Sequence, residues 1–217
     1  MLDRATTRTV HQCDAIAWLE GCSLSDDCAL VTSLPDSSEL RMRVADWERW
    51  FAATAELICR RTPERSVAIF FQTDVKLEGR WIDKSFFVQQ GARAAGAELL
   101  WHKIVCRAPA GITTFGRPGY AHLLCFSRAL RLTPGQSSAD VLPTLGKMTW
   151  ARAMGIDACV ATCRFLLEHT SARTVVDPFC GVGSMLAVAN AHGLDAIGIE
   201  LSRKRAERAR TLTWVKP

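Results

Sequence analysis

Features that would mark a disulfide-rich or zinc-binding protein are missing from this sequence. It contains no Cys-x-x-Cys pair, so its nine cysteines do not match a zinc finger or a zinc ribbon. Their odd number, spread over 217 residues, also argues against a disulfide framework. Most of them stand in apolar runs, which favours buried, reduced thiols that act as small hydrophobic side chains.

Long apolar runs are missing as well. No uninterrupted run approaches the roughly 20 residues of a membrane-spanning helix, and the first residues contain no apolar core of a signal peptide. Internal repeats and low-complexity tracts are also not visible. We therefore expect no membrane partner, and a cytoplasmic location or an equivalent reducing compartment.

The charge of either sign is modest. Lys and Arg number 27 and Asp and Glu number 22, which gives a net charge of +5. With 48% hydrophobic and 23% charged residues, the composition is that of a globular protein and excludes disorder and coiled coils. The length suits one ordinary domain. The small positive charge permits a nucleic-acid partner but does not require one.

The apolar pattern alternates between two kinds of segment. Short β-branched or aromatic runs predict buried strands at 28–32, 66–71, 99–106, 120–127, 174–176 and 196–200. Helical spacing predicts helices at 43–60, 84–95, 156–169, 183–192 and 203–211. Strands separated by helices favour an α/β fold with a doubly wound, mostly parallel sheet. Strands 99–106 and 120–127 have no helix between them and predict an antiparallel edge, whereas 132–148 is linker-like.

A glycine-rich loop after the strand at 174–176 is the most informative segment. The residues DPFCGVGS lead into an Ala-rich helix, and a second strand then ends at Glu200. Gly181 and Gly183 allow a tight turn and a close approach of ligand, and a carboxylate at the next strand end can accept from ribose hydroxyls. The loop is neither GxGxxG nor a P-loop. Its initial Asp177 disfavours pyrophosphate and suits a cationic amino-acid group, which points to S-adenosyl-L-methionine.

The segment DPFCGVGSM resembles the DPF-x-G-x-G-[ST] motif of S-adenosylmethionine-dependent amino-methyltransferases that act on nucleobases. In one circularly permuted group of that family the catalytic half precedes the cofactor half. Here 1–130 is similar to the catalytic half and 148–217 to the cofactor half, so the resemblance covers nearly the whole chain. It implies a single domain with a Rossmann-type sheet of permuted strand order. It also implies that the strand at 196–200 lies near residues 9–13.

The resemblance implies a set of cofactor-binding residues. Glu200 would hold the ribose, Leu201 would pack near the adenine, and Asp14 would accept from the adenine amino group. The methionine part of the cofactor would be surrounded by residues of the glycine-rich loop: Asp177, Phe179, Gly181, Gly183 and Ser184. The start of the helix that closes the pocket would contribute Met154, Gly155 and Ala158. No metal ligands are implied.

The catalytic motif departs from the family pattern. Ser33, Leu34, Pro35 and Asp36 stand where the family has [SDN]-P-P-[aromatic]. In the family the first side chain and a nearby backbone carbonyl accept from an exocyclic NH₂, and the aromatic ring stacks on the flipped base. Ser33 can still accept the amino group. Asp36 cannot stack, but it could act as a general base, or the sequence SLPD could be an ordinary turn.

The resemblance implies methyl transfer to a base in nucleic acid. The connectors leave little chain for reading a DNA sequence, so we expect RNA, recognised by shape, with DNA adenine or cytosine amino-methylation as the alternative. A protein partner could assist recognition. Two further alternatives are a catalytically silent cofactor-binding partner of another methyltransferase and a small-molecule methyltransferase. A basic, stacking surface could form from residues beside the catalytic turn: Arg41, Arg43, Arg107, Arg117 and Lys147 with Trp47, Trp50, Phe115 and Trp150.

Overall fold

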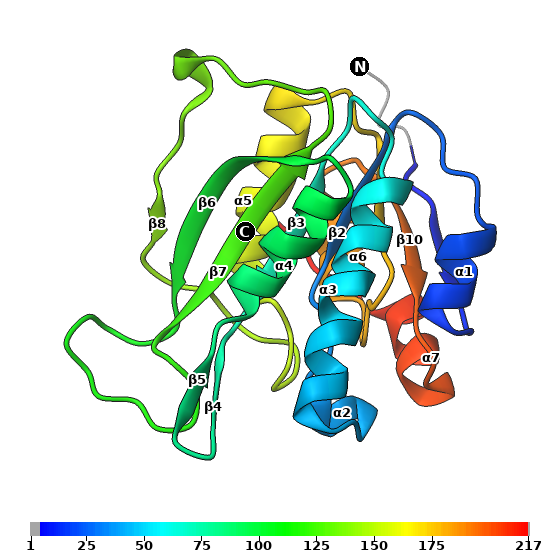
Figure 1. The fold of residues 1–217 in the computed structure, drawn as a ribbon. Helices are drawn as coiled ribbons and strands as arrows, with labels where there is room; N and C mark the ends of the chain where they lie inside the picture. Colours follow the sequence, from blue (N-terminus) through cyan, green and yellow to red (C-terminus); the bar gives the residue numbers. More distant parts are fainter. Residues whose placement is uncertain (1–4, 217) are drawn as a thin grey trace.

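One eight-stranded sheet forms the centre of the protein in a computed structural model, which describes residues 5–216 (Figure 1). The strands lie in the order β1-β10-β9-β2-β3-β7-β6-β8. The first five strands in this order run parallel to one another, and β7 is antiparallel to both of its neighbours. The strands are β1 (Arg8–His11), β2 (Cys28–Thr32), β3 (Ala68–Gln72), β6 (Glu98–Cys106), β7 (Tyr120–Ser127), β8 (Val141–Leu142), β9 (Thr174–Asp177) and β10 (Asp195–Ile199).

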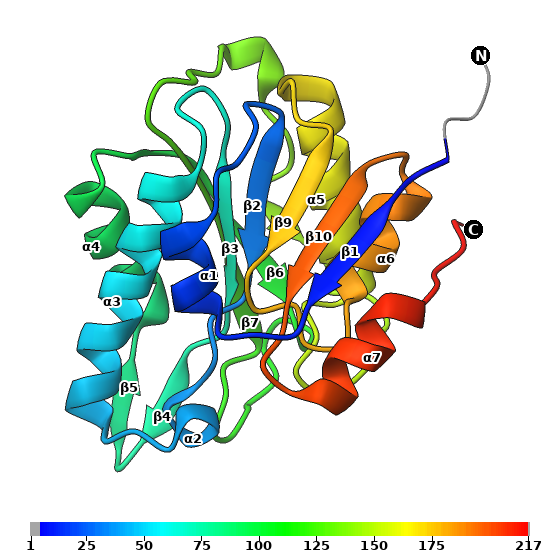
Figure 2. The same ribbon diagram turned by 90° about the vertical axis from the view of Figure 1, so that its right-hand side faces the viewer.

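Helices cover both faces of the sheet. In Figure 2, α1, α3 and α4 lie on one side of the strands, and α5, α6 and α7 lie on the other. The two faces correspond to two separate hydrophobic cores. The helices are α1 (Ala15–Gly21), α2 (Ser37–Leu40), α3 (Val44–Arg61), α4 (Lys84–Ala94), α5 (Ile156–His169), α6 (Ser184–Ala191) and α7 (Arg203–Thr211), with a 3₁₀ turn at Pro134–Gln136.

Burial on both faces explains why the central strands are continuous apolar runs. All of β2 is buried, and its side chains alternate between the two cores. Ala29 and Val31 belong to the core beneath α5 and α6, whereas Cys28 and Leu30 belong to the core beneath α3 and α4. A parallel strand covered on both sides has no solvent-facing positions, so its sequence does not alternate with polar residues. The predicted α/β fold with a doubly wound sheet is therefore confirmed.

The first and last strands of the described chain are neighbours in the sheet. Strand β1 pairs in parallel with β10, from Arg8 opposite Ala196 to His11 opposite Ile199. This neighbourhood is the one expected between residues 9–13 and 196–200. Figure 2 shows β1 and β10 side by side at one edge of the sheet. The consequence is that the N-terminal and C-terminal halves share one sheet.

The opposite edge differs in detail from the expectation. The antiparallel pair β6 and β7 is present, but β7 lies inside the sheet because β3 pairs with its other side. The linker-like stretch supplies the outermost strand, since β8 pairs in parallel with Ile104 and Val105 of β6. Two residues are too few to give a periodic signal in the sequence. The same holds for the hairpin formed by β4 (Val75–Leu77) and β5 (Arg80–Ile82).

The cysteines are free thiols, as the sequence predicts. Six of the nine are buried. Burial raises the pKa of the Cys59 thiol to about 12, so this group stays protonated and unreactive at neutral pH. Among the described residues, no helix combines the length and the apolar character needed to cross a membrane.

Candidate active site

The glycine-rich loop joins the end of β9 to the start of α6. Asp177, the last residue of β9, is only 3% exposed. Its Oδ1 accepts from the Thr32 hydroxyl at 2.7 Å and from the Phe179 backbone N–H at 3.1 Å. Burial raises the pKa of Asp177 to about 7, with a further contribution from the nearby Glu200 carboxylate. A buried carboxyl with a raised pKa, at the carboxyl end of a parallel strand, suits a cationic ligand.

The two glycines of the loop are required for different reasons. Both have positive φ, +55° at Gly181 and +84° at Gly183. A Cβ on Gly181 would lie 3.2 Å from the Trp150 ring, which borders the same pocket. A Cβ on Gly183 would lie 2.9 Å from the Ala209 Cα atom in α7. Gly181 therefore keeps space open at the pocket, whereas Gly183 allows α7 to pack against the loop.

Glu200 follows β10 and is also buried. Its Oε1 accepts from the Ser202 backbone N–H and from the Arg205 guanidinium, both at 2.7 Å. Within the described part of the chain its Oε2 accepts no hydrogen bond, and Glu200 borders the pocket. Arg205 also lies over the Trp150 ring, 5.8 Å from its centroid. Glu200 is thus fixed in place with one carboxylate oxygen left for a hydroxyl donor.

A pocket of about 340 Å³ opens along this edge of the sheet. Its lining includes eight of the predicted cofactor-binding residues: Asp14, Met154, Asp177, Phe179, Gly181, Ser184, Glu200 and Leu201. Gly155, Ala158 and Gly183 do not line it. Ala158 is in the core beneath α5, and a Cβ on Gly155 would lie 2.3 Å from the Leu145 carbonyl oxygen. Gly155 and Gly183 have no room for a side chain, because backbone segments approach them closely.

The turn predicted to be catalytic, Ser33 to Asp36, borders the same pocket and is called the catalytic turn below. Ser33, Leu34 and Pro35 follow β2 and line the pocket next to Asp177. The Pro35 carbonyl accepts from the indole N–H of Trp47 at 3.0 Å, so that carbonyl is already used. In the described part of the chain the Leu34 carbonyl accepts no hydrogen bond. The Ser33 hydroxyl and the Leu34 carbonyl are therefore the two acceptors that this turn can offer to a ligand.

Asp36 faces away from the larger pocket and forms two ion pairs. One of its carboxylate oxygens pairs with the Lys84 ammonium and the other with the Arg117 guanidinium. Burial favours a raised pKa for Asp36, but the two cations outweigh burial and lower the pKa below its usual value. A carboxylate with both oxygens paired and a lowered pKa is a poor proton acceptor. Asp36 therefore fits a positioning role better than that of a general base.

A second, smaller pocket of about 80 Å³ lies on the other side of the catalytic turn. It shares Ser33 and Leu34 of this turn with the larger pocket, together with Glu39, Arg152 and Ala153, so the two spaces meet here. Most of its charged groups are cations, whereas most of those around the larger pocket are acids. Its lining includes Asp36, Glu39, Gln72, Lys84, Arg107, Arg117 and Arg152.

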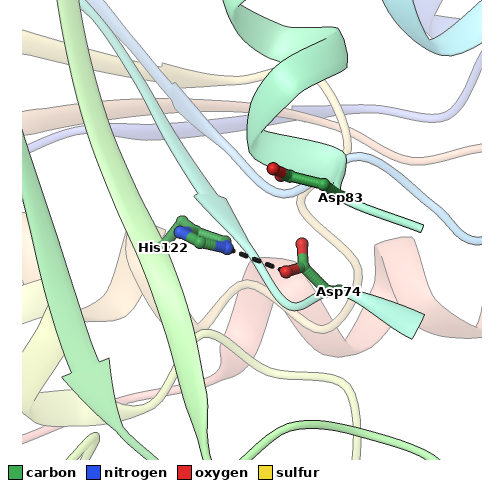
Figure 3. Close-up of side chains that lie close together, drawn as sticks. All are labelled: Asp74, Asp83 and His122. Atoms are coloured by element: carbon green, nitrogen blue, oxygen red, sulfur yellow. Dashed lines mark hydrogen bonds and ion pairs between the residues drawn. The ribbon is translucent and has the colours of Figure 1, made fainter. Parts of the chain in front are cut away.

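A hydrogen-bonded cluster lies next to Lys84, which lines the smaller pocket, and Figure 3 shows its Asp74 and His122 side chains facing each other. His122 Nε2 and Asp74 Oδ2 lie 3.0 Å apart, and His122 Nδ1 lies 2.9 Å from Nε2 of His102. The other Asp74 oxygen accepts from the backbone N–H of Lys84 at 2.9 Å. Asp83, the third residue drawn, caps α4 by accepting from the Phe86 N–H at 3.0 Å. The cluster holds the first turn of α4, and with it Lys84, against β3 and β7.

The predicted basic surface is only partly assembled. Arg107 and Arg117 meet at the smaller pocket, and Trp50 and Trp150 line the larger one. Trp47 is fully buried, and Lys147 lines a different pocket near the C-terminal segment. Arg41 and Arg43 lie between α2 and α3 and line neither pocket of the site. Phe115 is 90% exposed and lines neither pocket.

Three further pocket residues were not predicted from the sequence. Arg205 stands in a basic segment that has the pattern of a solvated helix face. Its ion pair with Glu200, five positions earlier, could have been inferred only from the short distance between the two residues along the chain. Gln72 is the last residue of β3, and Lys84 is the first residue of α4. Nothing in their sequence context separates them from ordinary residues at the ends of elements, so only the fold places them beside Asp36.

Comparisons with known proteins were made by sequence and by structure. No family model matches the sequence, and no curated protein matches it. Solved structures do match. One is TTHA0409 of Thermus thermophilus, provisionally assigned as a DNA modification methylase, with a TM-score of 0.72 and 17% identity over 94% of this chain and 92% of that one. The structure of its complex with S-adenosyl-L-methionine matches with a TM-score of 0.68 and 18% identity, over 94% of this chain and 91% of that one.

A second match is the cytosine-N4-specific PvuII DNA methyltransferase, with a TM-score of 0.72 and 14% identity over 95% of this chain and 88% of that one. The chain has a methyltransferase fold. At these identities the likeness shows the fold alone. The matching structures named here carry the names of DNA methylases, so they give no support to the expectation of RNA over DNA.

Proposed function

We propose that this protein is an S-adenosyl-L-methionine-dependent methyltransferase that modifies an exocyclic amino group of a base in nucleic acid. The observation that carries the proposal is the pair of pockets that meet at Ser33 and Leu34. One is acidic and stands at the carboxyl ends of β9 and β10, and the other is mainly cationic. This arrangement suits a cationic donor on one side of the turn and an electron-rich acceptor on the other.

The residues of the larger pocket fit the methyl donor. The buried Asp177 carboxyl is the acidic group for a cationic amino-acid part, and Phe179, Gly181 and Ser184 border the same space. The free Oε2 of Glu200 can accept from a ribose hydroxyl. Asp14 and Leu201, at the rim, would contact the adenine. When bound, S-adenosyl-L-methionine supplies a methyl group that its sulfonium has already activated.

The catalytic turn then has to orient the acceptor and needs no strong base. Ser33 Oγ and the Leu34 carbonyl would accept from the amino group, which directs the nitrogen lone pair toward the larger pocket. Alignment of the amino nitrogen with the methyl group of the donor can supply much of the acceleration of methyl transfer. Asp36 would act through its ion pairs, by holding Lys84 and Arg117 beside the turn. The smaller pocket holds about 80 Å³, well below the roughly 300 Å³ of ordinary small-molecule sites, which argues against a free small-molecule acceptor.

The direct test is transfer of a labelled methyl group from S-adenosyl-L-methionine to total DNA and to total RNA, each digested afterwards with a specific nuclease. We expect incorporation into one of the two, and loss of incorporation in Glu200→Gln and Ser33→Ala. The structural neighbours named as DNA methylases make DNA the first acceptor to try. Tight cofactor binding without incorporation into either nucleic acid would refute the proposal and favour the silent partner of another methyltransferase.

A further inference from the structure

One polar side chain in the smaller pocket is buried and has no hydrogen-bond partner. Gln72 is the last residue of β3, one strand away from the catalytic turn, and it is only 1% exposed. Among the described residues its Nε2 amide has no acceptor. Buried donors are almost always paired, because an unpaired one has lost its bonds to water without replacement. An orphaned donor at a pocket therefore marks a place where a ligand atom completes the bonding.

The two carboxylates of this pocket, Asp36 and Glu39, do not supply that partner, because both already pair with cations. Lys84 and Arg117 both pair with Asp36. Arg152 pairs with Glu39 at 2.6 Å. These pairs fix the walls of the pocket and leave the Gln72 amide as a neutral group that still requires an acceptor.

Arg107 adds a second unpaired donor group to the same pocket. It is half-buried at the end of β6, and in the described part of the chain its guanidinium pairs with no carboxylate and donates no hydrogen bond. Burial and the nearby Arg117 both lower its pKa, as expected for a cation that is not compensated by an acid. Two unpaired donor groups in one pocket require an electron-rich ligand edge, that is, ring nitrogens, carbonyl oxygens or phosphate.

We propose that Gln72 determines base specificity, by donating from Nε2 to the unprotonated ring nitrogen next to the amino group that is methylated. The proposal rests on the function proposed above. Cytosine and adenine both carry such an acceptor nitrogen beside their exocyclic NH₂, whereas uracil and thymine carry N–H there. The volume of about 80 Å³ accommodates one edge of a base, with the rest of the nucleotide outside. Gln72 thus selects amino bases, and the Ser33 turn binds the amino group itself.

The test compares Gln72→Met, which keeps the length of the side chain without its donor, with Gln90→Met on the exposed face of α4. For methyl transfer to the acceptor nucleic acid we expect kcat/KM to fall about tenfold in Gln72→Met and to stay unchanged in Gln90→Met. The calorimetric affinity for S-adenosyl-L-methionine should be the same in both. Because Gln72→Met removes an unpaired buried donor, its Tm should equal or exceed that of the wild type.

Two outcomes would overturn this role for Gln72. One is an unchanged kcat/KM in Gln72→Met, and the other is a lower Tm that accounts for the lost activity. If Gln72→Met fails to fold, Gln72→Glu serves in its place, since it keeps the shape and also removes the donor, and it should lose at least as much activity. An oligonucleotide in which the acceptor ring nitrogen is replaced by C–H should be a poor substrate for the wild type and should show no further loss with Gln72→Met. Absence of methyl transfer by the wild type refutes the proposed function instead, so the two failures are distinguishable.

Discussion

The two pockets beside the catalytic turn differ in their balance of charge. Acids outnumber cations around the larger one, which lies between β9, β10 and α1 and is bordered by Asp14, Asp177 and Glu200. Cations outnumber acids around the smaller one, which lies between β2, β3 and α4 and is bordered by Lys84, Arg107 and Arg117. Both pockets include Ser33 and Leu34 and are also bordered by Glu39 and Arg152. The proposed function assigns the cationic methyl donor to the larger pocket and the electron-rich acceptor to the smaller one.

The hydrogen bonds and ion pairs of the lining residues also differ between the two pockets. In the larger pocket the acids are only partly neutralised, since Asp177 accepts neutral hydrogen bonds and Glu200 keeps one oxygen free. In the smaller pocket the central acid, Asp36, is doubly paired, and the unpaired groups are donors. Among the described residues the larger pocket therefore offers an unpaired acceptor, whereas the smaller one offers unpaired donors. Each of the following changes should affect one pocket and leave the other intact.

The largest effect is expected for the support of the smaller pocket. In Asp36→Ala the Lys84 ammonium, whose side chain is 3% exposed, loses its only ion pair in the described chain. We expect the free energy of unfolding to fall by about 3–5 kcal/mol, because an uncompensated buried charge remains. Urea unfolding measures this. The control is Glu207→Ala, which removes an exposed pair with Arg203 and should change stability by less than about 1 kcal/mol. Equal small losses in both variants would contradict the assignment.

The next effect concerns the larger pocket. We expect Asp177→Asn to weaken S-adenosyl-L-methionine binding by about 2 kcal/mol, roughly 30-fold, because the carboxylate that would neutralise a cationic ligand is removed. Gln72→Met should not change that affinity. Isothermal titration calorimetry provides both values. An unchanged affinity in Asp177→Asn would remove the acidic pocket from the proposed cofactor site.

The Asp177 carboxyl should also make the stability of the fold and the affinity for S-adenosyl-L-methionine depend on pH. Burial raises its folded-state pKa from the usual 3.8 to about 7. Between about pH 4 and pH 7 the folded chain keeps a proton that the unfolded chain has lost, so this group stabilises the fold less as the pH rises and reaches its minimum above pH 7. Cofactor affinity should show the opposite trend and rise through pH 7, since the ionised form attracts the cation. Calorimetry and urea unfolding across this range should show both slopes in the wild type and neither in Asp177→Asn.

The smallest effect is expected for the outer part of the smaller pocket. Arg107→Met should weaken nucleic-acid binding several-fold and reduce the slope of log affinity against log salt by about 1, if this guanidinium contacts phosphate. Fluorescence anisotropy at several salt concentrations measures the slope. Arg203→Met, on the exposed face of α7, should leave it unchanged. The same slope in both variants would show that Arg107 contacts no phosphate.

Much of the fold could be predicted from the sequence, because the central strands and helices are long and strongly patterned. The predicted ranges 28–32, 120–127, 156–169 and 203–211 coincide with β2, β7, α5 and α7. The hairpin β4–β5, the helix α2 and the strand β8 were not predicted, since two to four residues carry no measurable periodicity. The outer position of β8 could not be predicted either, because edge pairing depends on which strand is left uncovered.

The candidate site divides in the same way. The Gly-rich loop, Asp177 and Glu200 stand in one short stretch of chain, so an acidic pocket after β9 and β10 could be predicted from local pattern alone. The ion pairs of Asp36 depend on the folded chain, because its two partners lie 48 and 81 positions away. The same is true of Gln72 Nε2, which has no acceptor among the described residues, and of Arg107, which pairs with no carboxylate there. Local pattern specifies which groups are present, but the net charge and pairing of a buried group depend on distant segments that the fold brings within bonding distance.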